Sequence, residues 1–210
     1  MVFLILFSMV LLILYSYVGW RLILPLDIST IYRYLLGILL VLFYCLPLLT
    51  IIFYFNKVET QWTRIIAWLG YTGLGAVSLL FFIQLGVDIV SGLSSLIGKS
   101  HKFDPYRRAF LGLSAKGVVG GLGVIGTIWG LYNAVKTPII KKVEISIEGL
   151  PESLQGFRMA QITDLHVGSM ITGKFVERVT RKIQDLNADI LFFTGDAADG
   201  SVQSYGKHLH

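Results

Sequence analysis

Hydrophobic residues dominate the first 135 positions of the chain and form four long runs separated by short polar stretches. A transmembrane helix needs about twenty mostly apolar residues to cross the hydrocarbon core. Four runs meet that requirement, at residues 1–19, 35–55, 65–90 and 117–135. The pattern therefore predicts a multi-span α-helical membrane region over residues 1–135. The first run has no basic segment ahead of it and no small-residue cleavage pattern, so we expect a retained span, not a signal peptide.

The pattern changes after Lys136 to the mixed charged and apolar sequence of a soluble domain. Residues 142–147 alternate between polar and apolar and predict a half-buried strand. Residues 158–163 predict a second strand, residues 174–186 an amphipathic helix, and residues 190–193 a short strand covered on both faces. Strand, helix and strand in this order indicate a parallel unit. We therefore predict a partial α/β domain over residues 136–210.

Basic residues crowd the connection between the third and fourth runs, namely Lys99, Lys102, Arg107 and Arg108. The positive-inside rule places this connection in the cytoplasm and the domain after Lys136 outside it. Arg107 and Arg108 ahead of an apolar segment also fit a twin-arginine export signal or a plain basic stop, and both interpretations give the same sidedness. We expect a multi-pass plasma-membrane protein with an extracytoplasmic C-terminal domain. Asp88 then falls at the cytoplasmic interface, and Gln84 has no obvious partner.

Composition supports a membrane protein, because 54% of the residues are hydrophobic and about 45–50% is usual for soluble domains. The net charge of +5 raises the possibility of nucleic-acid binding. The Lys and Arg residues are spread through short loops without a single basic face, so we exclude a nucleic-acid partner and name the lipid bilayer instead. The lone cysteine, Cys45, rules out an intrachain disulfide framework.

The residues that carry chemistry follow two of the predicted strands. Asp164 and His166 come after the strand at 158–163, and Asp196 comes after Gly195 at the end of the strand at 190–193. The carboxyl ends of parallel strands share one sheet edge, where ligands commonly bind. Two carboxylates and an imidazole suit Mn²⁺, Fe or Zn²⁺ better than Mg²⁺. Each motif alone is ambiguous, because an Asp after a strand is often a helix cap; the combination favours a metal site.

Residues 161–168, Gln-Ile-Thr-Asp-Leu-His-Val-Gly, and residues 188–200, which contain Thr-Gly-Asp-Ala-Ala-Asp-Gly, resemble the first two motifs of the calcineurin-like metallophosphoesterases. The layout of apolar spans followed by this domain is similar to the membrane-anchored bacterial branch of that family. The resemblance implies an α/β/β/α sandwich with a dinuclear centre of divalent metal ions that hydrolyses phosphomonoesters or phosphodiesters. It further implies that Asp164 and His166 bind the first metal, that Asp196 bridges both, and that Gly195 and Asp199 support them.

The later motifs of that family, which supply further Asn and His ligands, have no counterpart after Gly200. The remaining histidines there are His208 and His210, and no Asn follows. We therefore assign no further catalytic residue and expect a C-terminally truncated domain with an incomplete site. The resemblance favours a membrane-anchored phosphoric ester hydrolase, inactive as this chain stands, with a lipid or envelope-derived phosphate ester as substrate. The alternative is a non-catalytic helical membrane protein with an anchoring role.

Overall fold

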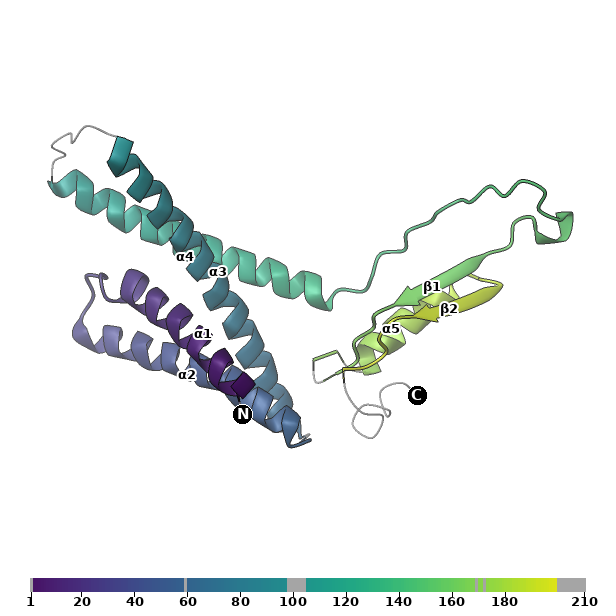
Figure 1. Ribbon diagram of the computed structural model, residues 1–210, viewed down its shortest axis with the longest axis horizontal. Helices are drawn as coiled ribbons and strands as arrows, with labels where there is room; N and C mark the ends of the chain where they lie inside the picture. The colour runs from purple at the N-terminus through teal and green to yellow at the C-terminus, as the bar shows by residue number, and fades with distance from the viewer. Residues whose placement is uncertain (1, 59, 98–104, 169, 172, 200–210) are drawn as a thin grey trace. The chain divides into compact units, whose positions relative to one another are not determined.

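The computed structural model describes residues 2–58, 60–97, 105–168, 170–171 and 173–199, with the backbone alone at 97 and 105–111. The chain divides into two compact units, Met1–Asn133 and Ala134–His210. Figure 1 shows the first unit as helical and the second as a small α/β unit.

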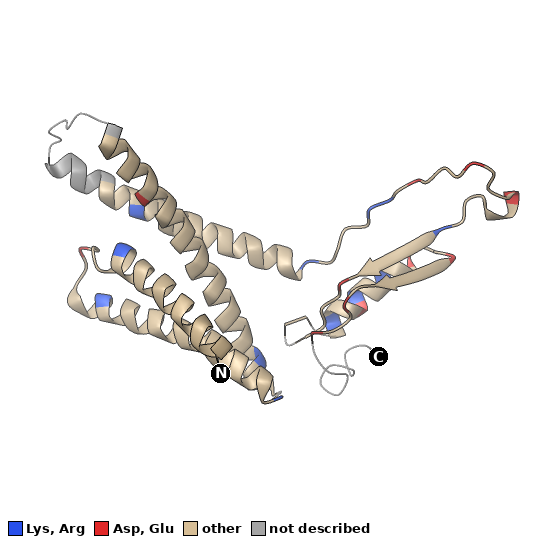
Figure 2. Cartoon of the chain, viewed as in Figure 1, with Lys and Arg blue, Asp and Glu red and all other residues tan. Residues whose placement is uncertain are grey.

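The first unit consists of long helices. They are α1 (Val2–Val18), which continues into the π-helical turn η1 (Gly19–Ile23), then α2 (Thr30–Phe55), α3 (Gln61–Ile97) and α4 (Pro105–Val135). Among the described residues, four segments are long and apolar enough to cross a membrane: Val2–Ile23, Thr30–Phe55, Gln61–Leu96 and Gly112–Val135. Figure 2 shows few charged residues along these helices. This distribution is that of membrane-spanning helices, and the unit is a membrane region.

A proline helps to join α1 to α2. Pro47 lies inside α2 and is buried, and proline has no N–H to donate to the carbonyl four residues earlier. The Tyr15 hydroxyl donates to that freed carbonyl, the Phe43 oxygen, at 3.0 Å. Tyr15 also belongs to the core cluster of this unit, together with Leu11, Val18 and Val77. The backbone defect in one helix is therefore satisfied by its neighbour, as is needed where no water is present.

Helix α4 approaches α3 through two glycines. A Cβ added at Gly123 would lie 2.4 Å from Leu80 Cδ2, and one at Gly126 would lie 2.5 Å from Leu79 Cδ2. Small residues at such positions let membrane helices pack closely. Gly123 and Gly126 are three positions apart and lie on one face of α4; Gly120, one turn earlier, has nothing within 4 Å of an added Cβ.

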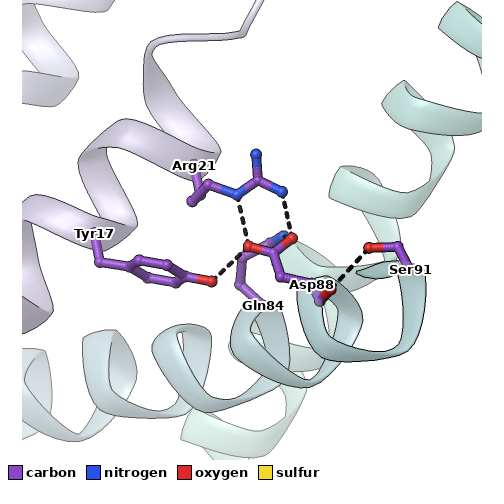
Figure 3. Close-up of polar contacts among 5 residues, drawn as sticks. All are labelled: Tyr17, Arg21, Gln84, Asp88 and Ser91. Atoms are coloured by element: carbon purple, nitrogen blue, oxygen red, sulfur yellow. Dashed lines mark hydrogen bonds and ion pairs between the residues drawn. The ribbon is translucent and has the colours of Figure 1, made fainter. Parts of the chain in front are cut away.

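A polar network links η1 and α1 to α3 (Figure 3). Arg21 donates through Nε (2.6 Å) and Nη2 to the two carboxylate oxygens of Asp88. The Tyr17 hydroxyl donates to Asp88 Oδ2 at 2.5 Å. Gln84 Nε2 donates to Asp88 Oδ1 at 2.8 Å. The expectation that Gln84 lacks a partner was therefore wrong, because an α-helix brings residues four positions apart onto one face.

The second unit contains the 3₁₀ turn η2 (Glu152–Leu154), strand β1 (Met159–Thr163), helix α5 (Gly173–Gln184) and strand β2 (Ile190–Thr194). The strands pair in parallel, with Met159 opposite Ile190 and Thr163 opposite Thr194. Helix α5 connects them and buries Val179, while Lys174, Glu177 and Arg181 are exposed. The predicted order of strand, helix and strand is therefore confirmed. The expectation that the second strand is covered on both faces is wrong for the described structure, because Ile190–Phe193 are each at least 40% exposed.

The strand predicted over residues 142–147 is not formed. These residues belong to no helix, strand or turn, and Val143, Ile145 and Ile147 are exposed. A strand exists only where its N–H and C=O groups pair with a neighbour. The described part of the unit has a sheet of two strands, β1 and β2, and neither pairs with this segment. The segment has the alternating sequence of a strand, but it pairs with neither described strand and so forms none.

Candidate metal centre

The loops that follow β1 and β2 run beside each other and hold the sequence-predicted ligands. The His166 N–H donates to the Asp196 carbonyl at 3.2 Å, and the Val167 N–H donates to the Ala197 carbonyl at 3.0 Å. Val167 then pairs with Ala198 in the register that aligns Thr163 with Thr194. Val167 is fully buried. The two loops therefore leave the strand ends and rejoin four residues later, with Asp164 and His166 on one side and Asp196 on the other.

Backbone conformation in these loops is unusual at three positions. Asp164 (φ 52°), His166 (φ 48°) and Gly195 (φ 88°) are in the left-handed region. That region is sparsely populated by residues with a side chain, although Asp and His enter it more often than most. Such conformations cluster at functional sites, where the surrounding structure maintains them.

Gly195 is required for steric reasons as well. A Cβ added there would lie 2.4 Å from Asp164 Oδ1 and 2.8 Å from Thr163 Oγ1. Real Cβ atoms do not approach other atoms so closely, so any side chain at position 195 would displace the Asp164 carboxylate. The close approach of the two loops depends on this glycine.

The Asp164 carboxylate is held by the protein on both oxygens. The Thr163 hydroxyl donates to Oδ2 at 2.5 Å, and the Asp196 N–H donates to Oδ1 at 3.3 Å. These donors, Thr163 first, lower the pKa of Asp164 below its usual value. Helix α5 begins only at Gly173, so neither hydrogen bond is a helix cap. The helix-cap interpretation of Asp164 is therefore wrong, and its carboxylate is ionised and fixed at the sheet edge.

His166 is oriented by an acid from the other loop. Its Nδ1 lies 2.5 Å from Asp199 Oδ1, and both side chains are about half exposed. The hydrogen bond with Asp199 raises the pKa of His166, and the negative charge of Asp199 adds to the effect. When Nδ1 carries the proton donated to a carboxylate, Nε2 is left with the lone pair that binds a metal. The Asp199 N–H donates to the Val167 carbonyl at 3.0 Å, which fixes the position of the acid.

The donor set fits a transition-metal ion in its chemistry. Two carboxylates and one imidazole lie on adjacent loops at one sheet edge. However, no three His, Cys, Asp or Glu side chains among the described residues are already gathered around one point. The structure joins Asp164 to the Asp196 backbone and His166 to Asp199. Among the described residues, no hydrogen bond or ion pair joins the side chains of Asp164, His166 and Asp196 to one another. The tail beyond residue 199, including His208 and His210, lies outside the described residues.

Two features of the site could not be found by motif spacing. One is the Thr163 hydroxyl, which holds Asp164 from the last position of β1. The other is the contact between His166 and Asp199, which joins residues 33 positions apart. The only sequence signal for either is the parallel strand pair, which brings the loops together.

Comparison with known proteins gives sequence relatives. No protein-family model and no solved structure matches the chain. A transmembrane protein with metallophosphoesterase domain from Danio rerio is 27% identical over 156 residues, which are 71% of this chain and 33% of that protein. An uncharacterized metallophosphoesterase of Campylobacter jejuni is 28% identical over 131 residues, 62% of this chain and 33% of its own length.

A shorter but closer match is to the UDP-2,3-diacylglucosamine pyrophosphatase LpxG of Chlamydia trachomatis. It is 49% identical over 43 residues, which are 20% of this chain and 13% of that protein. The chain thus spans about a third or less of the length of these curated relatives. Several relatives carry the metallophosphoesterase name, and two of them are named as transmembrane proteins. The described part of the chain itself has four helices that are long and apolar enough to cross a membrane. The chain is a membrane protein that is similar to proteins named metallophosphoesterases, as its sequence motifs indicate.

Proposed function

We propose that this chain is the membrane-anchored part of a metal-dependent phosphoric ester hydrolase, with Asp164, His166 and Asp196 as metal ligands. The observation that carries the proposal is the paired loops, in which Asp199 orients His166 and Gly195 makes room for the Asp164 carboxylate. Similarity to proteins named metallophosphoesterases supports it independently. The non-catalytic alternative gains no support from the relatives.

Each residue has a defined task in this proposal. Asp164 is kept ionised by Thr163 and the Asp196 N–H, so that it presents negative charge at the strand end. Asp199 keeps the His166 proton on Nδ1 and leaves Nε2 as the donor. A divalent Mn, Fe or Zn ion bound there would act as a Lewis acid and lower the pKa of a bound water. We propose that Asp196 bridges a dinuclear centre whose other ligands come from sequence that the longer relatives contain.

The domain organisation and the substrate are also part of the proposal. We place the membrane region at residues 1–135 and the metallophosphoesterase domain, a four-layer α/β/β/α sandwich, from residue 136; the break between compact units near residue 133 supports this boundary. A relative named as a pyrophosphatase of UDP-2,3-diacylglucosamine supports a lipid-linked phosphate ester as substrate. The positive-inside rule supports a plasma-membrane protein with the domain outside the cytoplasm.

Metal binding by the full chain tests the proposal without requiring turnover. The detergent-purified protein is incubated with Mn²⁺, and bound metal is measured by elemental analysis beside Asp164→Ala and the matched control Asp185→Ala, an exposed acid at the end of α5. We expect bound Mn²⁺ in the wild type and the control, and its loss in Asp164→Ala. Equal metal in all three proteins would overturn the ligand assignment.

A chromogenic phosphodiester added to the same samples tests the chemistry. Mn²⁺-dependent hydrolysis that is lost in Asp164→Ala would show that the described ligands suffice for catalysis. Metal binding without hydrolysis would confirm the expectation that this chain alone is inactive. Hydrolysis that persists in Asp164→Ala would contradict the proposed site.

A further inference from the structure

Two cationic side chains, one from α2 and one from α4, donate to the turn between η1 and α2, and a third cationic residue, Arg21, belongs to η1. Arg33 of α2 donates through Nη2 to the Leu26 carbonyl at 2.8 Å. Lys116 of α4 donates through Nζ to the Pro25 carbonyl at 3.3 Å. Because Pro25 and Leu26 are consecutive, these two cationic groups lie at neighbouring peptide units. Arg21 lies just before them, on η1.

Arg21 has one edge of its guanidinium engaged and the other open. Asp88 accepts from Nε and Nη2, and Nη1 points away from Asp88 (Figure 3). The Asp88 carboxylate accepts from Tyr17 and Gln84 as well, so it holds Arg21 in a fixed orientation. A guanidinium fixed in this way keeps N–H donors for a second planar or tetrahedral oxyanion.

Arg33 also has unused donor capacity. Its Nε is buried and has no hydrogen-bond partner among the described residues. A buried donor without an acceptor is costly, which favours an anion that can approach it. The one carboxylate in the turn, Asp27, is exposed and makes no hydrogen bond or ion pair among the described residues, so it does not neutralise these cations.

The surroundings match the amphipathic shape of a lipid. Trp20 is exposed and lies beside Arg21, whose Cζ is 5.4 Å from the ring centroid. Leu24 and Leu113 are exposed on the flanking segments. Tryptophan marks the headgroup level of a membrane, and exposed leucines can contact acyl chains. Basic pockets between membrane helices bind the phosphates of anionic lipids.

We propose that Arg21, Arg33 and Lys116 form a binding site for the phosphate of an anionic phospholipid at the η1–α2 turn of the membrane unit. Lys116 and Arg33 supply charge from α4 and α2, and Arg21 supplies its open edge. A lipid held there would join α1, α2 and α4 around one headgroup. This site is separate from the metal centre and does not depend on the phosphoesterase proposal.

The test uses the full chain in nanodiscs of phosphatidylcholine, with and without phosphatidylglycerol. Thermal unfolding and the phosphatidylglycerol retained after delipidation are measured for the wild type and the double variant Arg33→Gln/Lys116→Gln. The matched control is Lys57→Gln/Arg64→Gln, which removes the same charge at the α2–α3 turn, the other end of α2. We expect phosphatidylglycerol to raise the melting temperature of wild type and control. We expect retention in the double variant to fall by about tenfold or more.

Three results would overturn the proposal. If the double variant and the control lose the same amount of retained phosphatidylglycerol, the lipid is attracted to positive charge in general and not to this site. An absent effect of phosphatidylglycerol on wild type would mean that no site exists. Equal stabilisation by inorganic phosphate in pure phosphatidylcholine discs would mean a site for soluble anions.

A second variant keeps the test valid if the double variant fails to fold. Asp27→Asn removes the exposed carboxylate of the turn and leaves all three cations in place. We expect this variant to retain more phosphatidylglycerol than the wild type. Unchanged or reduced retention would count against the site.

Discussion

His166 Nδ1 and Asp199 Oδ1 lie 2.5 Å apart, although they belong to loops that follow different strands. The contact exists because Val167 and Ala198 resume the parallel pairing that β1 and β2 begin. The orientation of the His166 ring, a proposed metal ligand, therefore depends on the position of Asp199, which is not a proposed ligand.

We expect Asp199→Asn to weaken metal binding by about 10- to 100-fold, as for other acids that orient a histidine ligand. The amide cannot hold the proton on Nδ1 as a carboxylate does. Titration of the protein with Mn²⁺ or Zn²⁺ measures the effect, and Asp185→Asn is the control. An affinity that stays within twofold of wild type would show that Asp199 does not orient His166.

In the metal-free protein, the contact between His166 and Asp199 should be visible in the pH titration of the His166 ring. Asp199 raises the pKa of His166 above 6.5, because its hydrogen bond and its negative charge stabilise the protonated ring in the folded protein. The stability that this pair contributes is full below the unfolded pKa and is lost as pH rises through the folded pKa. NMR titration of the His166 ring should give a midpoint above 6.5, which moves toward 6.5 in Asp199→Asn. Identical midpoints in both proteins would contradict the contact.

Gly195→Ala should disrupt the site far more than an alanine at a comparable glycine. Gly156 has φ +76° and nothing within 4 Å of an added Cβ, so Gly156→Ala carries the left-handed cost of about 1–2 kcal/mol alone. Gly195→Ala adds the collision with Asp164. Urea unfolding and Mn²⁺ binding of the two variants separate these effects. Equal behaviour of both would show that the loops do not need the close approach.

Asp88→Asn should loosen the membrane unit. Arg21 would lose its charged acceptor, and interhelical polar contacts in membranes are worth about 1–2 kcal/mol. Arg21→Gln should cost a similar amount, and the double variant should cost less than the sum, because the two residues act as one pair. Thermal unfolding in detergent measures all three, with Asp27→Asn as the uncoupled control. Strict additivity would mean that the pair contributes nothing beyond its separate members.

Periodicity was sufficient to predict the elements around the site. Apolar positions at helical spacing identified the segment that became α5, and the uninterrupted Ile190–Phe193 run identified β2. The order of these elements then placed Asp164 and Asp196 at one edge. This inference was possible because the direction of parallel strands fixes where their loops emerge.

Contacts that depend on side-chain detail could not be predicted. The role of Pro47 depends on Tyr15 lying against its helix, and the pairing of Arg21 with Asp88 depends on the π-helical turn at Gly19–Ile23. Hydropathy reports only that these segments are apolar. At residues 142–147 the sequence pattern predicted an element that is not formed. Alternation of polar and apolar residues predicts a strand, but a strand forms only where a neighbouring strand pairs with it.

In the described structure, four apolar residues of β2 are each at least 40% exposed: Ile190, Leu191, Phe192 and Phe193. For a cell that makes this polypeptide, such a segment is a recognition signal for chaperones and proteases, which read exposed apolar strands as unfinished folding. Yield and lifetime of the chain would then be set by how quickly these four residues are covered.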